Sequence, residues 1–383
     1  MTAYSPELWT LTDRAHLSFA LDLHRALAPD PARTACWSPF SVASALGLVA
    51  AGARGTTREE LATLLLGDPT ADPEWLFAQL AAAGRLDAGT EREDRPILAV
   101  ADTLWADESI TVRDSFAEQL ARMPSGAVRN APFRNAPDSA RKLINSDVAR
   151  TTRDLIPELL PAGVIGPDTV AAVVNALYLK VAWRHRFESK GTRPEPFHAP
   201  GHTLSVPTMR LAERIGYAAV SGWEVVRLPA VGGVEATVLL PDGELAERER
   251  SLDADTLAEL VAAPEPRPVR LSLPRLKLTL RAELTPVLGA LGVRTVFSRD
   301  ADLSGISPDP LAVQAVLHET VLKVDEQGLE GAAATAVMIR LMSASPGRPV
   351  TVRVDRPFLL LVRHVETGVV YFLARVTDPG TRR

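Results

Sequence analysis

Residues 316–341 read VLHETVLKVDEQGLEGAAATAVMIRL, and this stretch joins a strand to an unusual segment. The alternating apolar residues of its first half predict a strand over 311–325. Small and apolar residues then fill 326–349 until a second strand begins at 350. A connection of this length inside a compact domain is usually functional or disordered.

This connection has a two-residue periodicity. One face would hold Leu329, Gly331, Ala333, Thr335, Val337, Ile339 and Leu341, and the other Glu330, Ala332, Ala334, Ala336, Met338 and Arg340. Both charges lie on the second face, which is the pattern of a strand with one buried side. Small residues would let such a strand enter between existing strands. A surface loop, or a helix favoured by the alanines, remains an alternative.

Outward from this stretch, the N-terminal third has helical periodicity and the remainder is mostly β. Helices are expected at 8–28, from Ser38–Pro39 onward, from a Thr56–Glu59 capping box onward, and at 74–85, 112–122, 138–152, 250–262 and 281–291. Strands are expected at 96–105, 168–182, 203–211, 216–229, 234–241, 268–280, 311–325, 350–355, 357–364 and 369–376. Strands from both ends of the chain need each other, so we expect one α+β domain over residues 1–383.

The composition excludes several classes of protein. The 383 residues are 46% hydrophobic and 23% charged, which is ordinary for a globular protein. The net charge of −5 offers no basic field for nucleic acid or an anionic membrane. Cys36 is the single cysteine, so no internal disulfide can form, and we expect a core thiol. The start has no basic region followed by an apolar stretch, so we expect a cytoplasmic protein, with export by another route left open.

Catalytic motifs are scarce in the sequence. Ser139 and Lys142 match the Ser-x-x-Lys pattern of penicillin-recognising enzymes, but the companion motifs of those enzymes are missing. A serine hydrolase is therefore a remote alternative, and an exposed helix start is the plainer interpretation. His198 and His202 are separated by Pro200 and Gly201, which break any helix that would align them on a metal. We predict no metal and no cofactor.

Six stretches in order resemble the serpin family. They are 38–46, 52–59, 174–180 with Trp183 and Phe187, 273–275 with 301–306, 318–328 and 356–360. The resemblance covers residues 8–380. The chain is identified as a bacterial-type, intracellular member of the family. The resemblance implies the α+β serpin fold with three β-sheets, about nine helices and an exposed reactive-centre loop at about 326–349.

The resemblance also implies suicide inhibition. A target serine protease, or alternatively a cysteine protease, attacks the loop as a substrate and forms a covalent acyl-enzyme. The cleaved loop then inserts into sheet A as an extra strand, and deacylation stalls. Such a protein is expected to be a monomer that has a metastable native state and no catalytic residues. A non-inhibitory serpin that binds or carries another molecule is the alternative.

The resemblance assigns roles to individual residues. Family spacing puts the scissile bond between Met342 and Ser343. The hinge is assigned to Glu326, Gln327, Gly328, Leu329, Glu330, Gly331, Ala332, Ala333, Ala334 and Thr335. The polar cluster under the centre of the sheet (the shutter) is assigned to Ser38, Ser41, Asn175 and His318. The point where insertion starts (the breach) is assigned to Trp183, Arg275 and Glu326.

Some residues depart from the family pattern. Leu329 replaces the usual threonine or serine, Gly331 replaces alanine, and Asp147 replaces a tryptophan of the helix that covers sheet A. Leucine can enter the sheet because it is apolar, although its bulk would slow the first step of insertion. Met342 suits an elastase-, chymotrypsin- or subtilisin-like pocket, whereas Arg340 or Arg348 would suit a trypsin-like pocket.

Overall fold

The computed structural model describes residues 11–87, 95–121, 126–166, 169–314, 316–329 and 348–380. Within these ranges it has nine α-helices and a short 3-10 helix at Thr295–Phe297. The α-helices are α1 (Leu11–Leu27), α2 (Pro39–Gly52), α3 (Gly55–Leu66), α4 (Glu74–Ala83), α5 (Asp114–Ala121), α6 (Pro137–Thr151), α7 (Leu245–Arg250), α8 (Ala254–Ala262) and α9 (Thr285–Ala290). Every helix in the described ranges is too short or too polar to span a bilayer.

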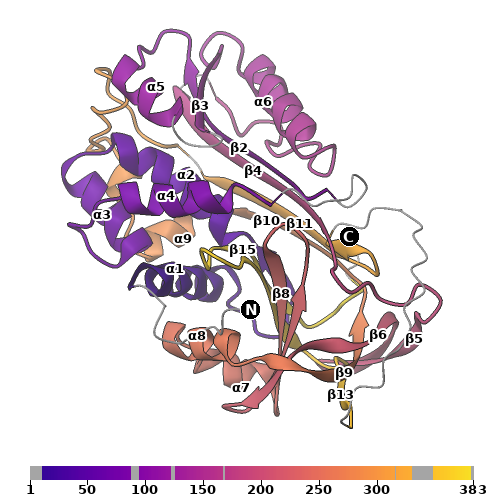
Figure 1. Ribbon diagram of the computed structural model, residues 1–383. Helices are drawn as coiled ribbons and strands as arrows, with labels where there is room; N and C mark the ends of the chain where they lie inside the picture. Colours follow the sequence, from indigo (N-terminus) through magenta and orange to yellow (C-terminus); the bar gives the residue numbers. More distant parts are fainter. Residues whose placement is uncertain are drawn as a thin grey trace.

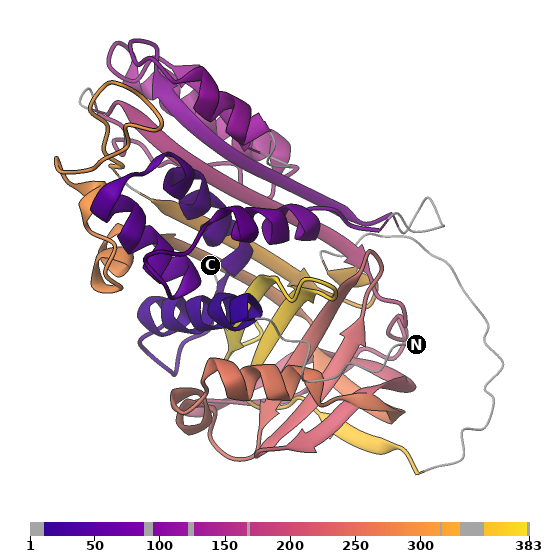
Figure 2. The same cartoon turned by 60° about the vertical axis from the view of Figure 1, so that its left-hand side comes forward.

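Sheet A contains six strands in the order β10-β11-β12-β4-β2-β3. The strands are β10 (Leu276–Glu283), β11 (Leu317–Val324), β12 (Gly328–Leu329), β4 (Ala171–Ala182), β2 (Ile97–Asp107) and β3 (Gly126–Ala131). Figures 1 and 2 show α6 along one face of this sheet and the group of α1, α2, α3, α4 and α9 on the other. The sheet is therefore covered by helices on both faces.

The remaining strands form a nine-stranded sheet in the order β1-β15-β14-β8-β7-β6-β9-β13, with β5 paired to β6. They are β1 (Ala35–Trp37), β15 (Val370–Val376), β14 (Phe358–His364), β8 (Val234–Pro241), β7 (Trp223–Pro229), β6 (His202–Val220), β9 (Glu265–Pro274), β13 (Val350–Arg353) and β5 (Arg193–Ala199). Strand β6 pairs with β5, β9 and β7 in turn along its 19 residues. The two further sheets that the serpin resemblance implies are thus joined into one continuous sheet through β6. The predicted α+β fold is confirmed.

The two faces of β4 belong to different hydrophobic clusters. Its odd-numbered residues, such as Val173 and Leu177, join the main core with α2. Its even-numbered residues, such as Val174 and Ala176, form a smaller cluster with Ile144 and other residues beneath α6. Because both faces are apolar, the strand reads as a continuous hydrophobic run in the sequence.

Several strand boundaries differ from the prediction. The expected break between 203–211 and 216–229 is wrong, because β6 continues to Val220 and turns at Ser221 and Gly222. These two residues have φ of 51° and 77°, as a two-residue hairpin turn requires. The single strand expected over 268–280 is also wrong, because β9 ends at Pro274 and β10 begins in the other sheet. The prediction missed the short strands β1, β3 and β5.

Two helix predictions are also corrected. The helix expected over 250–262 is α8, which begins only at Ala254, where the side chain of Asp253 accepts a hydrogen bond from the Thr256 amide. The short helix α7, which ends at Arg250, was not predicted. The capping box at Thr56 is wrong, because α3 begins at Gly55. The Thr57 hydroxyl instead accepts a hydrogen bond from the Asp302 amide at 3.0 Å. By contrast, the expected Ser38 cap of α2 is confirmed, since its hydroxyl accepts from the Ser41 amide.

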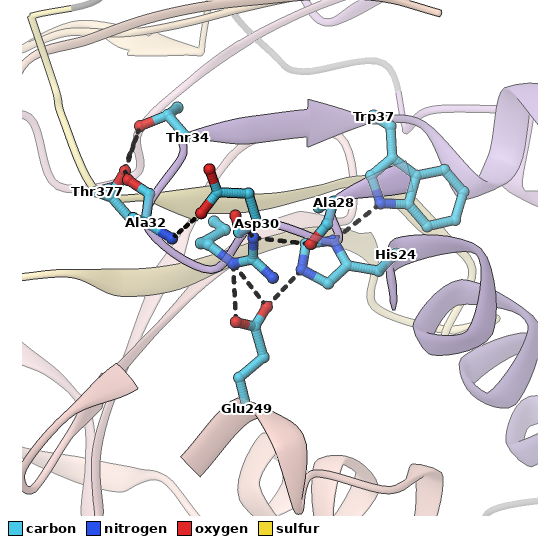
Figure 3. A network of polar contacts seen from close by, with 9 residues as sticks. His24, Ala28, Asp30, Ala32, Thr34, Trp37, Glu249 and Thr377 are labelled. Atoms are coloured by element: carbon cyan, nitrogen blue, oxygen red, sulfur yellow. Dashed lines mark hydrogen bonds and ion pairs between the residues drawn. The ribbon is translucent and has the colours of Figure 1, made fainter. Parts of the chain in front are cut away.

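A buried ionic network ties the two ends of the described chain together (Figure 3). Trp37 Nε1 donates to His24 Nδ1 at 3.2 Å, so the other ring nitrogen, Nε2, carries a proton and donates to Glu249 at 2.6 Å. Arg375 donates to both oxygens of the same carboxylate at 3.0 and 2.7 Å. Burial opposes the charge of Glu249, but the hydrogen bonds from His24 and Arg375 outweigh burial and lower its pKa. Elements α1, β1, α7 and β15 are thereby joined.

Candidate functional site

The first residues of the predicted hinge already lie inside sheet A. Leu329 pairs with Val324 of β11 and with Val181 of β4, and it is 1% exposed. Gly328 pairs with Ala182 of β4. A Cβ atom at Gly328 would lie 2.0 Å from the Val181 carbonyl oxygen, so only glycine fits at this position. Among the described strands, β12 lies between β11 and β4 and pairs with both.

A tight turn leads from β11 into β12. The Asp325 carboxylate accepts hydrogen bonds from the amides of Gln327 at 2.8 Å and Gly328 at 3.3 Å. The Asp325 amide in turn donates to the Gly328 carbonyl at 3.0 Å. Aspartate two residues before the bonded amide is a turn signature that the sequence contained, but the prediction gave Asp325 no role. This turn fixes the direction in which β12 enters the sheet.

A charged pair lies beside the turn. The Arg275 guanidinium donates to Glu326 through Nε at 2.9 Å and through Nη2 at 2.7 Å. The Thr192 hydroxyl, which the sequence did not single out, donates to the same carboxylate. The Glu326 side chain is 7% exposed and that of Arg275 is 48% exposed. Burial opposes the charge of Glu326, but the hydrogen bonds from Arg275 and Thr192 outweigh burial and hold its pKa below the usual range.

Trp183, the residue that follows β4, contacts the same turn. Its indole Nε1 donates to the Asp325 carbonyl at 2.8 Å, and its amide donates to the Gln327 carbonyl at 2.9 Å. The Phe187 amide donates to the Glu326 carbonyl at 3.1 Å. The structure therefore brings Trp183, Arg275 and Glu326 together around one end of β12.

A buried polar cluster lies further along the sheet, where α2 begins. The Ser38 amide donates to His318 Nε2 at 3.2 Å, and the Thr320 hydroxyl is 2.7 Å from the same nitrogen. Burial lowers the pKa of His318 to about 4, which keeps the ring neutral near pH 7. Asn175 is buried on β4, on the face that α2 covers. The structure thus joins Ser38, Ser41 and His318 by hydrogen bonds, with Asn175 on the strand facing them.

Two apolar cavities flank the other end of β4. A cavity of about 40 Å³ lies on the α6 side and is lined by residues that include Ala172, Val174 and Leu317. A cavity of about 10 Å³ lies on the core side and is lined by residues that include Val173 and Val313. Unfilled apolar space lowers stability, because the side chains around it lose dispersion contacts.

Helix α6 is fastened to sheet A by ionic contacts. Asp147 is buried on its inner side and accepts a hydrogen bond from Arg129 of β3 at 2.6 Å, and Arg150 also donates to it. The Arg129 guanidinium lies 5.6 Å from the centre of the Trp105 ring. The substitution of aspartate for the family's tryptophan therefore has a local compensation, which the sequence did not reveal.

Part of the predicted reactive-centre loop is buried rather than exposed. Residues 326–329 belong to the turn and to β12, because Glu326 is ion-paired and Leu329 is apolar. The predicted hinge residues Glu330, Gly331, Ala332, Ala333, Ala334 and Thr335 lie outside the described residues, as do Met342 and Ser343.

The structure gives the serine hydrolase hypothesis no support. Ser139 is exposed near the start of α6. The Lys142 ammonium lies 2.7 Å from the Asp138 carboxylate, and the side chains of both are largely exposed. Cys36 is buried in β1, as expected, and burial raises the pKa of its thiol.

Comparisons with known proteins agree with one another. The family model described as Serpin (serine protease inhibitor) matches residues 14–379. The chain is 33% identical to Iripin-2 of Ixodes ricinus over 376 residues, which cover 95% of this chain and 92% of that protein. It is 30% identical to Serpin B4 of Homo sapiens, over 95% of this chain and 98% of that protein.

Two solved structures are similar in fold. One is a thyroxine-binding globulin complex with thyroxine and the other is uncleaved ovalbumin. Each has a TM-score of 0.83 and covers 96% of this chain and 99% of its own, at 22% and 26% identity respectively. Proteins of this family are protease inhibitors rather than catalysts. The match over nearly the whole length, with a relative above 30% identity, shows that the chain belongs to the serpin family of serine protease inhibitors.

Proposed function

We propose that this chain is a single-domain, monomeric suicide-substrate inhibitor that traps serine proteases by inserting its cleaved loop between β11 and β4. The observation that carries the proposal is the position of Leu329. Its backbone pairs with both strands and its side chain is buried, so the first step of insertion is already present in the intact chain. Leucine therefore fits the sheet at this position.

The register of β12 specifies how insertion would continue. Each residue beyond Leu329 would pair with residues of β11 and β4 that lie correspondingly earlier in those strands. By this count Thr335 would lie between His318 and Asn175, on the core side of the sheet. The uncharged face of 329–341 would then be the buried face, in agreement with its period of two.

Burial of apolar side chains would supply a driving force for insertion. Continuing the same register would put Val337 next to Val173 and Met338 next to Ala172, which line the two cavities. Removing the apolar side chains of the loop from water would be favourable by roughly 25 cal/mol per Å² of surface buried. The cleaved form would therefore be more stable than the intact one, as trapping requires.

The chemistry of trapping is acyl transfer to the protease. The catalytic serine of the protease would attack the carbonyl carbon of Met342, and the amino group of Ser343 would leave. The ester would hold the protease on the new end of the loop while the loop inserts. Met342 favours proteases with an elastase-, chymotrypsin- or subtilisin-like pocket, and cleavage after Arg340 or Arg348 would indicate a trypsin-like target. A cysteine protease is the secondary target class, and no cofactor is needed.

The test is incubation with elastase, chymotrypsin, subtilisin and trypsin, followed by a denaturing gel. We expect a covalent complex with at least one of the first three proteases. Clean loop cleavage by every protease, with no complex, would falsify the inhibitory proposal. Leu329→Arg should convert the inhibitor into a substrate, because an arginine would have to be buried between β11 and β4. Leu329→Val is the matched control and should still form the complex.

A non-inhibitory binding or carrier role is the second candidate. The sequence features that favour it are Leu329 and Gly331, at positions where inhibitors usually carry threonine or serine and alanine, respectively. In that case nicking the loop would leave the melting temperature unchanged, because the loop would stay outside the sheet. A sharp rise in melting temperature after nicking would exclude this candidate.

A further inference from the structure

Four arginines share one face of the sheet next to the predicted reactive loop. Strand β9 pairs with β6 on one side and with the edge strand β13 on the other. In one row Arg210, Ser272 and Arg353 lie side by side, and in the next row Arg270 lies between Ala212 and Thr351. Arg214 follows one row further on the same face of β6. Paired residues point to the same side of a sheet, so these guanidinium groups project together.

This arginine patch (Arg210, Arg214, Arg270 and Arg353) is accessible. Arg214, Arg270 and Arg353 are exposed, whereas the residues that alternate with them, such as Leu271 and Val352, are buried. Within the described part of the chain, Arg210 of the patch forms an ion pair with Glu195. The patch thus carries four positive charges and one bound carboxylate on a chain whose net charge is −5.

The position of the patch specifies its partner. Strand β13 begins at Val350, eight residues after Met342, so the proposed scissile bond lies no more than about 29 Å along an extended chain from the start of this strand, next to the row that holds Arg270. A protease of about 250 residues has a radius of gyration of about 18 Å and is therefore about 45 Å across. A protease that holds the loop in its active site would extend over this distance.

We propose that the arginine patch is a docking surface for an acidic face of the target protease. This inference rests on the proposed inhibitory function and adds selectivity by protease charge to selectivity by the pocket that binds Met342. Complementary charge raises association rates by about 10- to 1000-fold at low ionic strength and has little effect at high salt. The patch would act on the encounter, before the acyl-enzyme forms.

The probe is chymotrypsin with its lysines succinylated, which converts ammonium groups into carboxylates, compared with unmodified chymotrypsin. We expect the second-order inhibition rate constant for the succinylated enzyme to be about tenfold higher in 10 mM salt, with the difference lost in 0.5 M salt. The variant Arg270→Ser/Arg353→Ser should lose this advantage. The matched control Arg85→Ser/Arg299→Ser removes two exposed arginines outside the patch and should keep it.

A binding measurement separates this proposal from the proposed function. Fluorescence anisotropy with succinylated chymotrypsin whose active-site serine has been sulfonylated reports docking without acylation. Weaker binding by the patch variant than by the control supports the patch, even if no covalent complex forms. Equal binding by both variants overturns it. Patch-dependent binding of inorganic polyphosphate, without any preference for the succinylated enzyme, would also overturn it in favour of a polyanion site.

Discussion

The Asp147 carboxylate of α6 accepts a hydrogen bond from Arg129 of β3 at 2.6 Å, which fastens the helix to the edge of sheet A. A second contact lies just beyond the end of α6, where the Arg153 guanidinium lies 5.3 Å from the centre of the Tyr178 ring of β4. Both contacts lie on the same side of β12 in the strand order. Opening the sheet between β11 and β4 would therefore move α6 together with β4, β2 and β3.

The Asp147–Arg129 pair should contribute measurably to stability. The side chain of Asp147 is 7% exposed, so removing Arg129 leaves this buried charge with Arg150 of the same helix and unfastens it from β3. We expect a double-mutant cycle with Asp147→Asn and Arg129→Met to give a coupling energy of about 1–3 kcal/mol by urea unfolding. A cycle on the exposed pair Asp138–Lys142 of the same helix is the control and should give a clearly smaller coupling energy. Equal coupling in both cycles would contradict this role.

Gly328→Ala should displace β12 from the sheet. The new Cβ would meet the Val181 carbonyl oxygen, a backbone atom that cannot turn away. We expect a loss of about 1–3 kcal/mol and faster hydrogen exchange at Leu329, measured by mass spectrometry. Gly289→Ala is the control, because a Cβ at that helical position meets nothing within 4 Å. Unchanged protection of Leu329 in Gly328→Ala would mean that the sheet adjusts at no cost.

Stability should fall with pH below neutrality because of buried histidines. Burial lowers the pKa of His318 and of His16 to about 4, compared with an ordinary value near 6.5. The unfolded chain therefore binds more protons between pH 6.5 and 4, and stability is lost as pH falls through that window. Each histidine should contribute a loss of about 2 kcal/mol between pH 6.5 and 5.

The measurement is the urea midpoint between pH 7 and pH 5. This range avoids the titration of Glu249 and Glu326, whose pKa values are lowered in the fold. Their contribution to stability is lost only below the pH range in which a glutamate ordinarily titrates. His318→Gln should remove the share of the pH dependence that His318 contributes, while His16 and His364, whose pKa burial also lowers, keep theirs. His198→Gln, at an exposed position, should leave it unchanged, and a His318→Gln profile identical to wild type would refute the assignment.

In the network around Glu249, removing one buried charge should destabilise the protein more than removing both. Arg375→Met leaves the carboxylate with His24 alone of the two side chains that bind it and should cost about 3–5 kcal/mol. The double variant Glu249→Gln/Arg375→Met removes both charges and should be more stable than Arg375→Met alone. Thermal melting of the two variants distinguishes these cases. A double variant less stable than Arg375→Met would show that Glu249 is stabilised by other groups.

The accuracy of the sequence prediction followed the strength of the local signal. Long runs with alternating or continuous apolar residues, as in β4 and β14, gave strands near the predicted places. Short pairs at sheet edges, such as β1 and β3, gave no such signal, because three to six residues carry little periodicity. The capping box predicted at Thr56 is wrong because α3 already begins at Gly55, and the neighbouring Thr57 hydroxyl accepts a hydrogen bond from the distant Asp302 amide, which no local pattern predicts.

The sequence by itself determined which residues of 316–341 can share a buried face, because the period of a strand is a local property of the backbone. It also carried the motifs that identify the serpin family. Only the tertiary structure decided that Leu329 is already paired with Val181 and Val324 and that Asp147 is compensated by Arg129. The partners in these contacts lie up to about 150 residues apart in the chain. Pairing between such distant segments depends on the packing and charges of the whole fold, so no local sequence pattern predicts it.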